Sequence, residues 1–265
     1  MTANANPFKE QIQKQSLSVG PYTLRAVPTG YFGLDGGAMF GTVPKIVWEK
    51  SNPADANNRI LMEARALLLD AGPTTAPGQR PRRILIDCGI GGDFSAKYGE
   101  KIGPKFAEMY NVQGGAGIIA GLASLQLSVD DITDVVLTHL HFDHAGGATV
   151  YTPQGELIPT FENATVYVHQ GEWQDALNPS PKSKASYLPE NFLPLQQWGK
   201  LELLDAPKTE ILPGMWLQVS GGHTQHHQIL TLQTPQGGLV YWGDLIPTHH
   251  HLRIPYVMAY DLYPV

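Results

Sequence analysis

The sequence predicts an α+β domain whose strands fall into two groups, with helices between and outside them. Glycine and proline are frequent, at 28 and 21 of 265 residues, and they are scattered, which suits many strands joined by turns better than a helical bundle. Short apolar runs repeatedly end in polar clusters, written TH, SGGH and WGD in the sequence. Loops on a rigid sheet commonly carry function, so this pattern indicates a site at one edge of the sheets.

The first third of the chain reads as strands and turns. Residues 23–44 predict a short strand followed by a glycine-rich loop. Residues 66–72 and 82–92 predict the two strands of a hairpin, because the turn-forming residues 72–81 separate them.

The rest of the chain mixes helices with strands. Helices, or helices joined to a buried strand, are expected at 103–112, 117–127, 129–141 and 164–177. The Ser/Pro/Lys-rich residues 180–194 predict an exposed and mobile loop. A strand ending in glycines is expected at 215–223, and two apolar strands around the turn 234–238 are expected at 227–247.

Composition and charge narrow the class of protein. Hydrophobic residues make up 42% of the chain and charged residues 16%, which is compatible with a folded core. The net charge of -6 argues against nucleic acid as a partner, and the single cysteine, Cys88, excludes an internal disulfide framework. Residues 1–15 lack the features of a signal peptide, and no apolar run approaches the ~18 residues of a membrane helix. We therefore expect a soluble, cytoplasmic protein that acts on a small molecule without membrane contact, and a homodimer is left open.

Metal-capable side chains gather in residues 135–147, written VVLTHLHFDHAGG. Alternate residues of an extended segment point the same way, so His139, His141 and Asp143 can aim at a common point. His144 points elsewhere and can serve a second ion beside the first. A run of surface polar residues is the alternative interpretation, but it does not explain why three histidines and an acid follow a buried strand.

Two later strand ends supply further candidates. His223 follows an apolar strand and two glycines, and we interpret it as a ligand, with His226 and His227 as supporting or surface residues. Asp244 follows an apolar strand that we expect to be buried, where a carboxylate requires a partner and a metal ion is the simplest one. An aspartate that caps a turn or pairs with an arginine is the alternative.

Two residues of the segment ILIDCG are expected to have structural roles. Asp87 is a third acid at a strand end, and we interpret it as a residue that orients a ligand histidine through the free N–H of its ring. A single thiol without matching spacing is more often a small buried residue than a ligand, so Cys88 is predicted to be buried.

The motifs THLHFDHAGG, GGH and WGD occur in that order after LIDCG, and together they resemble the metallo-β-lactamase superfamily over most of the chain. The resemblance implies a four-layer αββα sandwich, in which two mixed β-sheets face each other with helices outside and a dinuclear metal site at one edge. It also implies a set of ligands: His139, His141 and His223 on one metal, Asp143 and His144 on the second, and Asp244 bridging both.

Within the superfamily, the stretches GDLIPT and MAYDLYP look most like the branch that holds quorum-quenching N-acyl-homoserine lactonases. The commonest class B β-lactamases use a cysteine where Asp244 stands, the flavodiiron branch has glutamate in place of His141, and the nucleic-acid-processing branch carries a large inserted domain. Organophosphate hydrolases are near relatives. Some lactonases have a tyrosine at the position of Pro247, so that feature is missing here.

The resemblance implies a metal-dependent hydrolase that opens a lactone ring with a metal-bridged hydroxide. Asp143 is a ligand that also suits carrying a proton to the leaving group. Two divalent ions are expected, with zinc favoured by the ligand types and iron, manganese and cobalt left open. The alternatives are a phosphotriester or phosphodiester hydrolase of the same fold, and a metal-binding chain with weak catalysis. Residues 31–40 and 106–110 either line an acyl pocket or belong to the core.

One feature of the family concerns the end of the chain. The superfamily places a further histidine on the second metal, in a late segment, whereas only a short segment follows Asp244 here. We therefore expect a single domain over residues 1–265 that lacks the last helix and strand of the family. Three consecutive histidines remain as substitutes for the absent ligand: His249, His250 and His251. The second metal is then expected to bind more weakly than the first.

Overall fold

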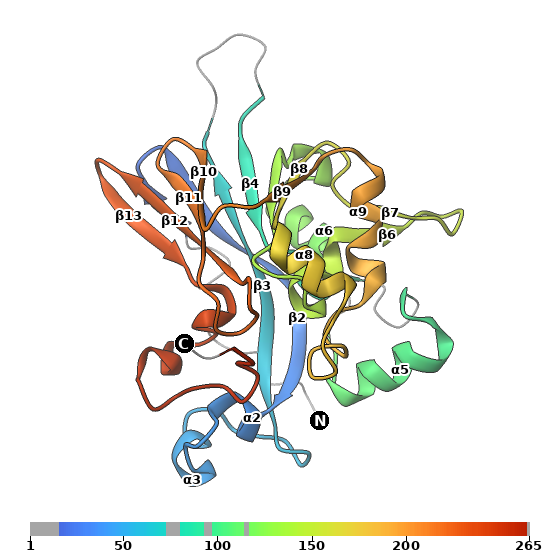
Figure 1. The fold of residues 1–265 in the computed structure, drawn as a ribbon, viewed down its shortest axis with the longest axis vertical. Coiled ribbons are helices and arrows are strands. Elements are labelled where there is room, and N and C mark those ends of the chain that lie inside the picture. The colour runs from blue at the N-terminus through green and yellow to red at the C-terminus, as the bar shows by residue number, and fades with distance from the viewer. Residues whose placement is uncertain (1–15, 73–79, 93–96, 114–116, 264–265) are drawn as a thin grey trace.

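The computed structural model describes residues 16–72, 80–92, 97–113 and 117–263. The turn expected at 72–81 lies mostly outside these ranges, and the polar stretch 1–15 lies wholly outside them. Two facing β-sheets dominate the architecture, and helices pack on the outer side of the larger sheet (Figure 1). The sandwich fold predicted from the sequence is confirmed.

The larger sheet is mixed, with antiparallel strands on one side and parallel strands on the other. Antiparallel pairing joins β1 to β2, β2 to β3 and β3 to β4, and parallel pairing joins β4 to β5, β5 to β8 and β8 to β9. Parallel strands are normally covered on both faces, and every residue of β5 is buried. The strands, in spatial order, are β1 (Ser16–Val19), β2 (Tyr22–Asp35), β3 (Arg59–Asp70), β4 (Arg83–Ile86), β5 (Asp134–Val136), β8 (Thr165–His169) and β9 (Leu201–Leu204).

The smaller sheet is antiparallel throughout, although two mixed sheets were predicted, because its consecutive strands are neighbours joined without a crossover. Leu217 and Leu230 on one of its faces share a buried cluster with Ile84 and Ile86 of the larger sheet, so the interior between the sheets is apolar. Its strands, in spatial order, are β10 (Lys208–Leu212), β11 (Met215–Val219), β12 (Gln228–Thr234) and β13 (Gly237–Tyr241). A separate hairpin consists of β6 (Thr149–Tyr151) and β7 (Leu157–Pro159).

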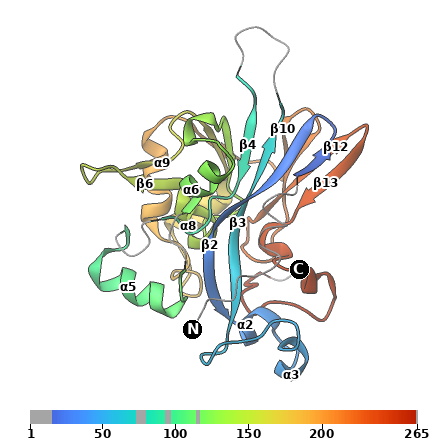
Figure 2. The same cartoon turned by 180° about the vertical axis from the view of Figure 1, so that it is seen from behind.

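Helices cover the face of the larger sheet that points away from the smaller one. Side chains of these helices, such as Leu122, Trp173 and Leu195, are buried in one cluster with Val135 and Val168 of the sheet. The helices on this side are α5 (Gly99–Met109), α6 (Gly117–Ser124), α8 (Gln170–Leu177) and α9 (Leu193–Gln197) (Figure 2). Among the described residues, no helix combines the length and the apolar character that a membrane crossing requires.

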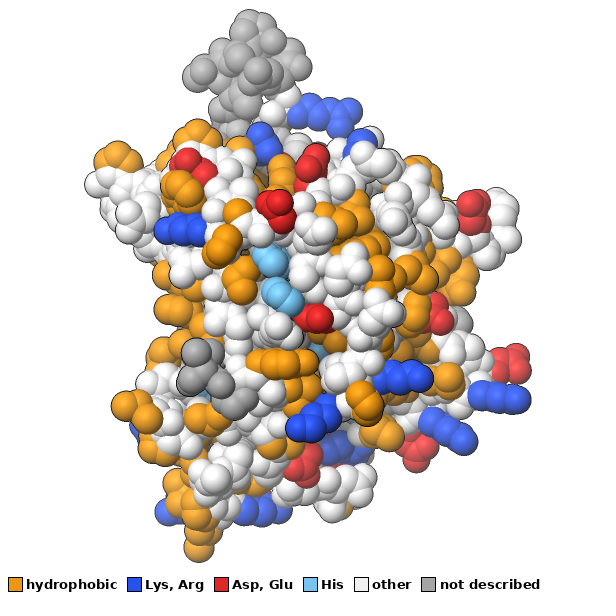
Figure 3. Space-filling model, in the orientation of Figure 1, with side chains coloured by type: hydrophobic (Ala, Val, Ile, Leu, Met, Phe, Trp, Pro, Cys, Tyr) orange, Lys and Arg blue, Asp and Glu red, His pale blue; other side chains and the backbone are white. Residues whose placement is uncertain are grey.

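Shorter helical turns connect these layers. α2 (Gly36–Phe40) and α3 (Lys45–Trp48) lie at the far end of the long β2–β3 ribbon, as both ribbon views show. The others are α7 (Phe142–Ala145) and the 3₁₀ turns η1 (Val129–Asp131), η2 (Gly146–Ala148), η3 (Pro189–Asn191), η4 (Gly243–Leu245) and η5 (His249–Leu252). On the outside, apolar, acidic and basic side chains are interspersed over the face that Figure 3 shows, so no single sign of charge covers that face.

The element predictions were correct in type for most segments, and several differ in extent or type. The strand expected at 66–72 is the longer β3, which begins at Arg59. The strand expected to be short is β2, which continues to Asp35 because it pairs with β3 along its length. The glycine-rich loop after it is the helix α2, which Asp35 caps by accepting a hydrogen bond from Ala38 N–H at 2.8 Å. The helix expected at the start of 129–141 is only the turn η1.

Two predictions of exposure were also wrong. The segment 180–194 is partly built into the core, since Tyr187, Asn191 and Phe192 are 5%, 0% and 1% exposed. The strand before Asp244, expected to be buried, is β13 at the edge of the smaller sheet, and its Val240 is 36% exposed. An edge strand is covered on fewer sides than a central one, and the apolar sequence does not reveal which position a strand takes.

Candidate metal centre

Two loops that follow strands bring three histidines together. After β5 the chain passes through His139 and His141 and then enters α7. After β11 it turns at Gly221 and Gly222, whose φ angles of 64° and 88° suit glycine, and then reaches His223. The three histidines are 0%, 6% and 4% exposed, so they lie inside the protein.

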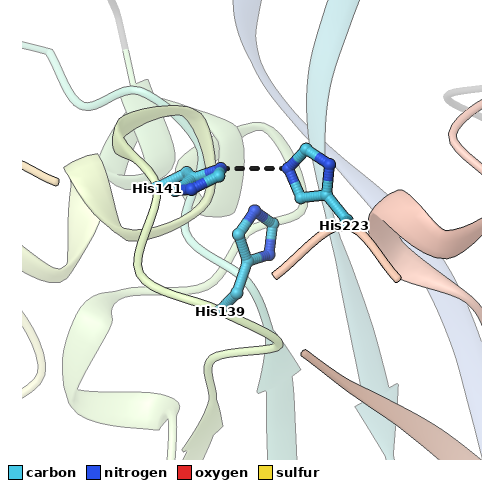
Figure 4. A group of neighbouring side chains, drawn as sticks. All are labelled: His139, His141 and His223. Carbon is cyan, nitrogen blue, oxygen red and sulfur yellow. Dashed lines mark hydrogen bonds between the residues drawn. The ribbon is translucent and has the colours of Figure 1, made fainter. Parts of the chain in front are cut away.

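The three imidazoles point at one another (Figure 4). His223 Nε2 lies 3.0 Å from His141 Nδ1, and each of the three residues offers a nitrogen within 4.8 Å of the other two. The Nε2 atom of His139 is buried and has no hydrogen-bond partner in the protein. Three nitrogen lone pairs directed at one point form a typical ligand set for a divalent ion.

Asp87 sets the orientation of two histidine rings. Its carboxylate accepts hydrogen bonds from Thr138 N–H and from the Thr138 hydroxyl, and His144 Nδ1 donates to Asp87 Oδ2 at 2.9 Å. Because the Thr138 hydroxyl donates to Asp87, it can accept from His139 Nδ1, which lies 3.0 Å away. In both rings Nδ1 is the atom that bonds to this network, so Nε2 is the atom directed into the site, and the contact predicted between Asp87 and a histidine is present.

Burial keeps two of the histidines neutral. It lowers the pKa of His139 well below the ordinary value, and the neighbouring His144 adds to the shift. It also lowers the pKa of His141, and the neighbouring His223 contributes in the same direction. A neutral imidazole retains the lone pair that binds a metal, so the low pKa values suit ligands.

A second group lies beside the first and shares His139. It consists of His139, His144 and Asp244, and His144 Nε2 lies 3.1 Å from Asp244 Oδ1. The other carboxylate oxygen of Asp244 lies 3.5 Å from His223 Nε2, so Asp244 stands between the two groups as the predicted bridge would. Asp143 lies slightly farther out, with Oδ2 at 3.6 Å from His144 Nε2, and it is not part of the tighter group.

The other predicted histidines lie outside these groups. His227 supports the site: it is fully buried, burial lowers its pKa to about 3, and its Nε2 accepts a hydrogen bond from Asp244 N–H. His226 lies near the surface and pairs with Asp175 at 2.8 Å. Cys88 is buried, as predicted.

The histidine run after Asp244 forms the turn η5 instead of folding back. His251 Nε2 lies 2.8 Å from the carbonyl oxygen of Met39, and its ring stacks on Phe40. Within the part of the chain that the structure describes, neither candidate metal group includes His249, His250 or His251.

Two acidic residues of the site were missed by the sequence analysis. Glu172 is fully buried on α8. The signal for its burial was its spacing to Ala176, a buried residue that lies four positions later on the same helix face. Asp261 lies in the segment MAYDLYP, and its Oδ1 is 3.4 Å from His223 Nδ1. Through that contact Asp261 favours a proton on His223 Nδ1, which leaves Nε2 for a ligand bond.

A cavity of about 460 Å³ opens beside these groups. His141, Asp143, His144, His223 and Asp244 all line it. Its other walls are largely apolar, and the predicted pocket segments contribute to them: Phe32, Leu34, Met39 and Tyr110 line it together with Met62, Phe142 and Met258. A volume of this size is typical of a small-molecule site with a few polar groups in an apolar wall.

The residues present fit a metal ion. The orphaned Nε2 of His139, the neutral imidazoles of His139 and His141 and the carboxylate of Asp244 form a set of nitrogen and oxygen donors that suits zinc and several other divalent ions. The same donors held without a cation would leave buried polar atoms unpaired, which is unfavourable.

Comparison with known proteins supports the assignment of a metal centre. The sequence profile described as Metallo-beta-lactamase superfamily matches residues 82–265. The N-acyl homoserine lactonase AiiA of Bacillus thuringiensis subsp. kurstaki is 32% identical over 111 residues, which cover 42% of this chain and 37% of that protein. The match therefore spans little more than a third of the length of this curated relative.

Solved structures extend the likeness over nearly the whole chain. A probable metal-dependent hydrolase from Staphylococcus aureus is 35% identical, with a TM-score of 0.80, and the match covers 94% of this chain and 82% of that one. AidC, described as a dizinc quorum-quenching lactonase in complex with a product, is 21% identical with a TM-score of 0.63, over 88% of this chain and 74% of that one. At that identity the likeness to AidC shows a shared fold.

Proposed function

The chain belongs to the metallo-beta-lactamase superfamily, and from this premise we propose that it is a metal-dependent hydrolase that opens a lactone ring. An N-acyl-homoserine lactone is the proposed substrate. The observation that carries this proposal is the position of the apolar cavity, which begins at the histidine and aspartate groups and extends along Phe32, Met39 and Met62. An acyl chain fits such a wall while the polar ring lies beside the proposed ligands.

Two divalent ions, with zinc favoured, are proposed to occupy the two groups. His139, His141 and His223 would hold one ion, His144 and Asp143 would hold the other, and Asp244 would lie between them. When bound, such ions acidify water and polarise a carbonyl oxygen. Lactone hydrolysis needs both effects, because water must attack the carbonyl carbon near neutral pH.

The chain's own residues then orient the substrate and move protons. Hydrolysis forms a bond from the water oxygen to the carbonyl carbon and breaks the ring bond to oxygen, so the leaving alkoxide needs a proton. Asp143 lines the cavity, and burial raises the pKa of its carboxyl group; the neighbouring His144 opposes this shift and Asp244 adds to it. Asp143 is therefore suited to take the proton from water and deliver it to the alkoxide.

The similarity to N-acyl homoserine lactonases supports this choice of substrate. It is tested by assaying the zinc-loaded chain on a series of N-acyl-homoserine lactones, following the acid released by ring opening, with an aryl phosphotriester as the competing substrate. We expect turnover of the lactones, and none in His139→Ala. Faster turnover of the phosphotriester than of every lactone would replace the proposed substrate, and inactivity on both would refute the proposal.

A further inference from the structure

A buried carboxylate that touches neither metal group lies behind the three histidines. Glu172 stands in the first turn of α8 and is 0% exposed. A charge in such a place is unfavourable unless donors surround it, and three donors do. Burial raises the pKa of Glu172, and the hydrogen bonds from Thr224, Leu140 and Tyr187 oppose that shift.

The first donor lies between two of the proposed ligands. The backbone N–H of Leu140 donates to Glu172 Oε1 at 3.0 Å. Leu140 separates His139 from His141, and its own side chain is fully buried. The carboxylate therefore fixes the backbone from which both imidazoles project.

The second donor packs against an imidazole. The hydroxyl of Tyr187 donates to the same Oε1 atom at 2.9 Å. The Tyr187 ring packs against the ring of His141, with centroids 4.9 Å apart and an angle of 64°, and the backbones of the two residues pair as in a β-bridge. Glu172 thus limits the tilt of the His141 ring through Tyr187.

The third donor belongs to the other loop. The hydroxyl of Thr224 donates to Glu172 Oε2 at 2.7 Å, and Thr224 is 2% exposed. Thr224 directly follows His223, whereas Leu140 lies in the loop after β5. One carboxylate therefore bonds to both loops that supply the histidines, although residues 140 and 224 are far apart in sequence.

We propose that Glu172 is the positioning residue that holds His139, His141 and His223 in the arrangement a metal ion needs. This inference rests on the proposed metal centre, and Glu172 acts only through Leu140, Tyr187 and Thr224. A carboxylate accepts all three hydrogen bonds without a proton of its own. An apolar residue at this position would leave three buried donors unpaired and free the two loops to move relative to each other.

The test is a titration of the metal-free chain with Co²⁺ alone, in which affinity is measured with a competing chelator and geometry by visible absorption. We expect Glu172→Ala to bind Co²⁺ about 10- to 100-fold more weakly than the unchanged chain and to show an altered spectrum. Glu172→Gln should recover most of the affinity, because its amide oxygen can accept from Leu140 and Tyr187 while the Thr224 hydroxyl turns to accept from the amide. Asp175→Asn, on the same helix and paired with His226 near the surface, is the matched control and should bind as the unchanged chain does.

Two further variants keep the test informative if Glu172→Ala does not fold. Tyr187→Phe and Thr224→Val each remove one donor and leave Glu172 in place, and we expect each to weaken Co²⁺ binding and the double variant to weaken it further. Unchanged affinity and spectrum in the double variant would overturn the proposal, as would an unchanged chain that binds no Co²⁺. Tight Co²⁺ binding without lactone hydrolysis would refute the proposed function and leave the role of Glu172 standing.

Discussion

His223 Nε2 lies 3.0 Å from His141 Nδ1, although the two residues are 82 positions apart in the chain. Two imidazole nitrogens at this distance either share a proton or share a metal ion. His139 offers a third nitrogen within 4.8 Å of both, so a divalent cation, which binds all three nitrogens at once, is the better partner. The strength with which this pair of histidines links the two loops therefore depends on how tightly the ion is bound.

Replacing one member of this pair should abolish tight metal binding. We expect His223→Ala to lose at least one retained ion per chain, because the other two histidines alone leave a zinc site incomplete. His226→Ala is the matched control, since His226 lies in the same loop and pairs with Asp175 near the surface. Metal analysis after gel filtration measures both variants, and full metal retention in His223→Ala would contradict the assignment.

Asp143→Asn should lower kcat far more than it changes KM for the lactone. The amide cannot carry a proton, and general acid or base catalysis typically contributes about 100- to 10,000-fold to the rate. Steady-state kinetics at saturating Zn²⁺ measure the two constants, and the metal content of each sample is determined alongside. A variant with normal metal content and normal kcat would remove Asp143 from the mechanism.

The two proposed ions should differ in affinity. His139, His141 and His223 offer three nitrogens to the first ion, whereas the second has His144 with the carboxylates Asp143 and Asp244. We therefore predict one tightly held ion and one weaker ion. Zinc released stepwise to a chromophoric chelator measures this, and two ions released together at the same chelator strength would show that the sites are equivalent.

Met62→Trp should shorten the cavity and change the preference for acyl chains. Met62 lines the cavity from β3, while Leu61, the preceding residue of the same strand, is 60% exposed. We expect KM in Met62→Trp to rise for long acyl chains and to stay nearly constant for short ones, because the added ring fills space along the apolar wall that a long chain would occupy. Leu61→Trp is the control and should leave both unchanged. An equal rise for every chain length would place the acyl group elsewhere.

Local periodicity was sufficient to predict much of this site. His139 and His141 follow a buried strand at alternate positions, and His223 and Asp244 follow later strands, so their convergence at one sheet edge could be expected. A hydrogen bond between Asp87 and a ligand histidine could also be expected, because Asp87 follows a strand too. These inferences needed the spacing of residues along one segment and the order of the segments, whereas the family resemblance implied how the ligands divide between two metals.

The residues that the sequence did not reveal act across distant segments. Glu172 receives donors at positions 140, 187 and 224, and nothing in the segment around it shows that those donors exist. The same reason explains the burial of Tyr187, which was predicted to be exposed in a polar loop. The position of a strand in its sheet posed a similar problem. The apolar β13 was expected to be buried but lies at an edge of its sheet, and the partners of Asp244 are His144 and His227.

Hydrolysis of an N-acyl-homoserine lactone, followed while Zn²⁺ is added to the metal-free chain, tests the central claim most directly. The proposed centre predicts no turnover before metal is added. The rate should then rise as zinc fills the site of His139, His141 and His223 and the second site beside it. A chelator should return the rate to its starting value. A chain that is fully loaded with zinc and still leaves every lactone of the series intact would contradict the assignment.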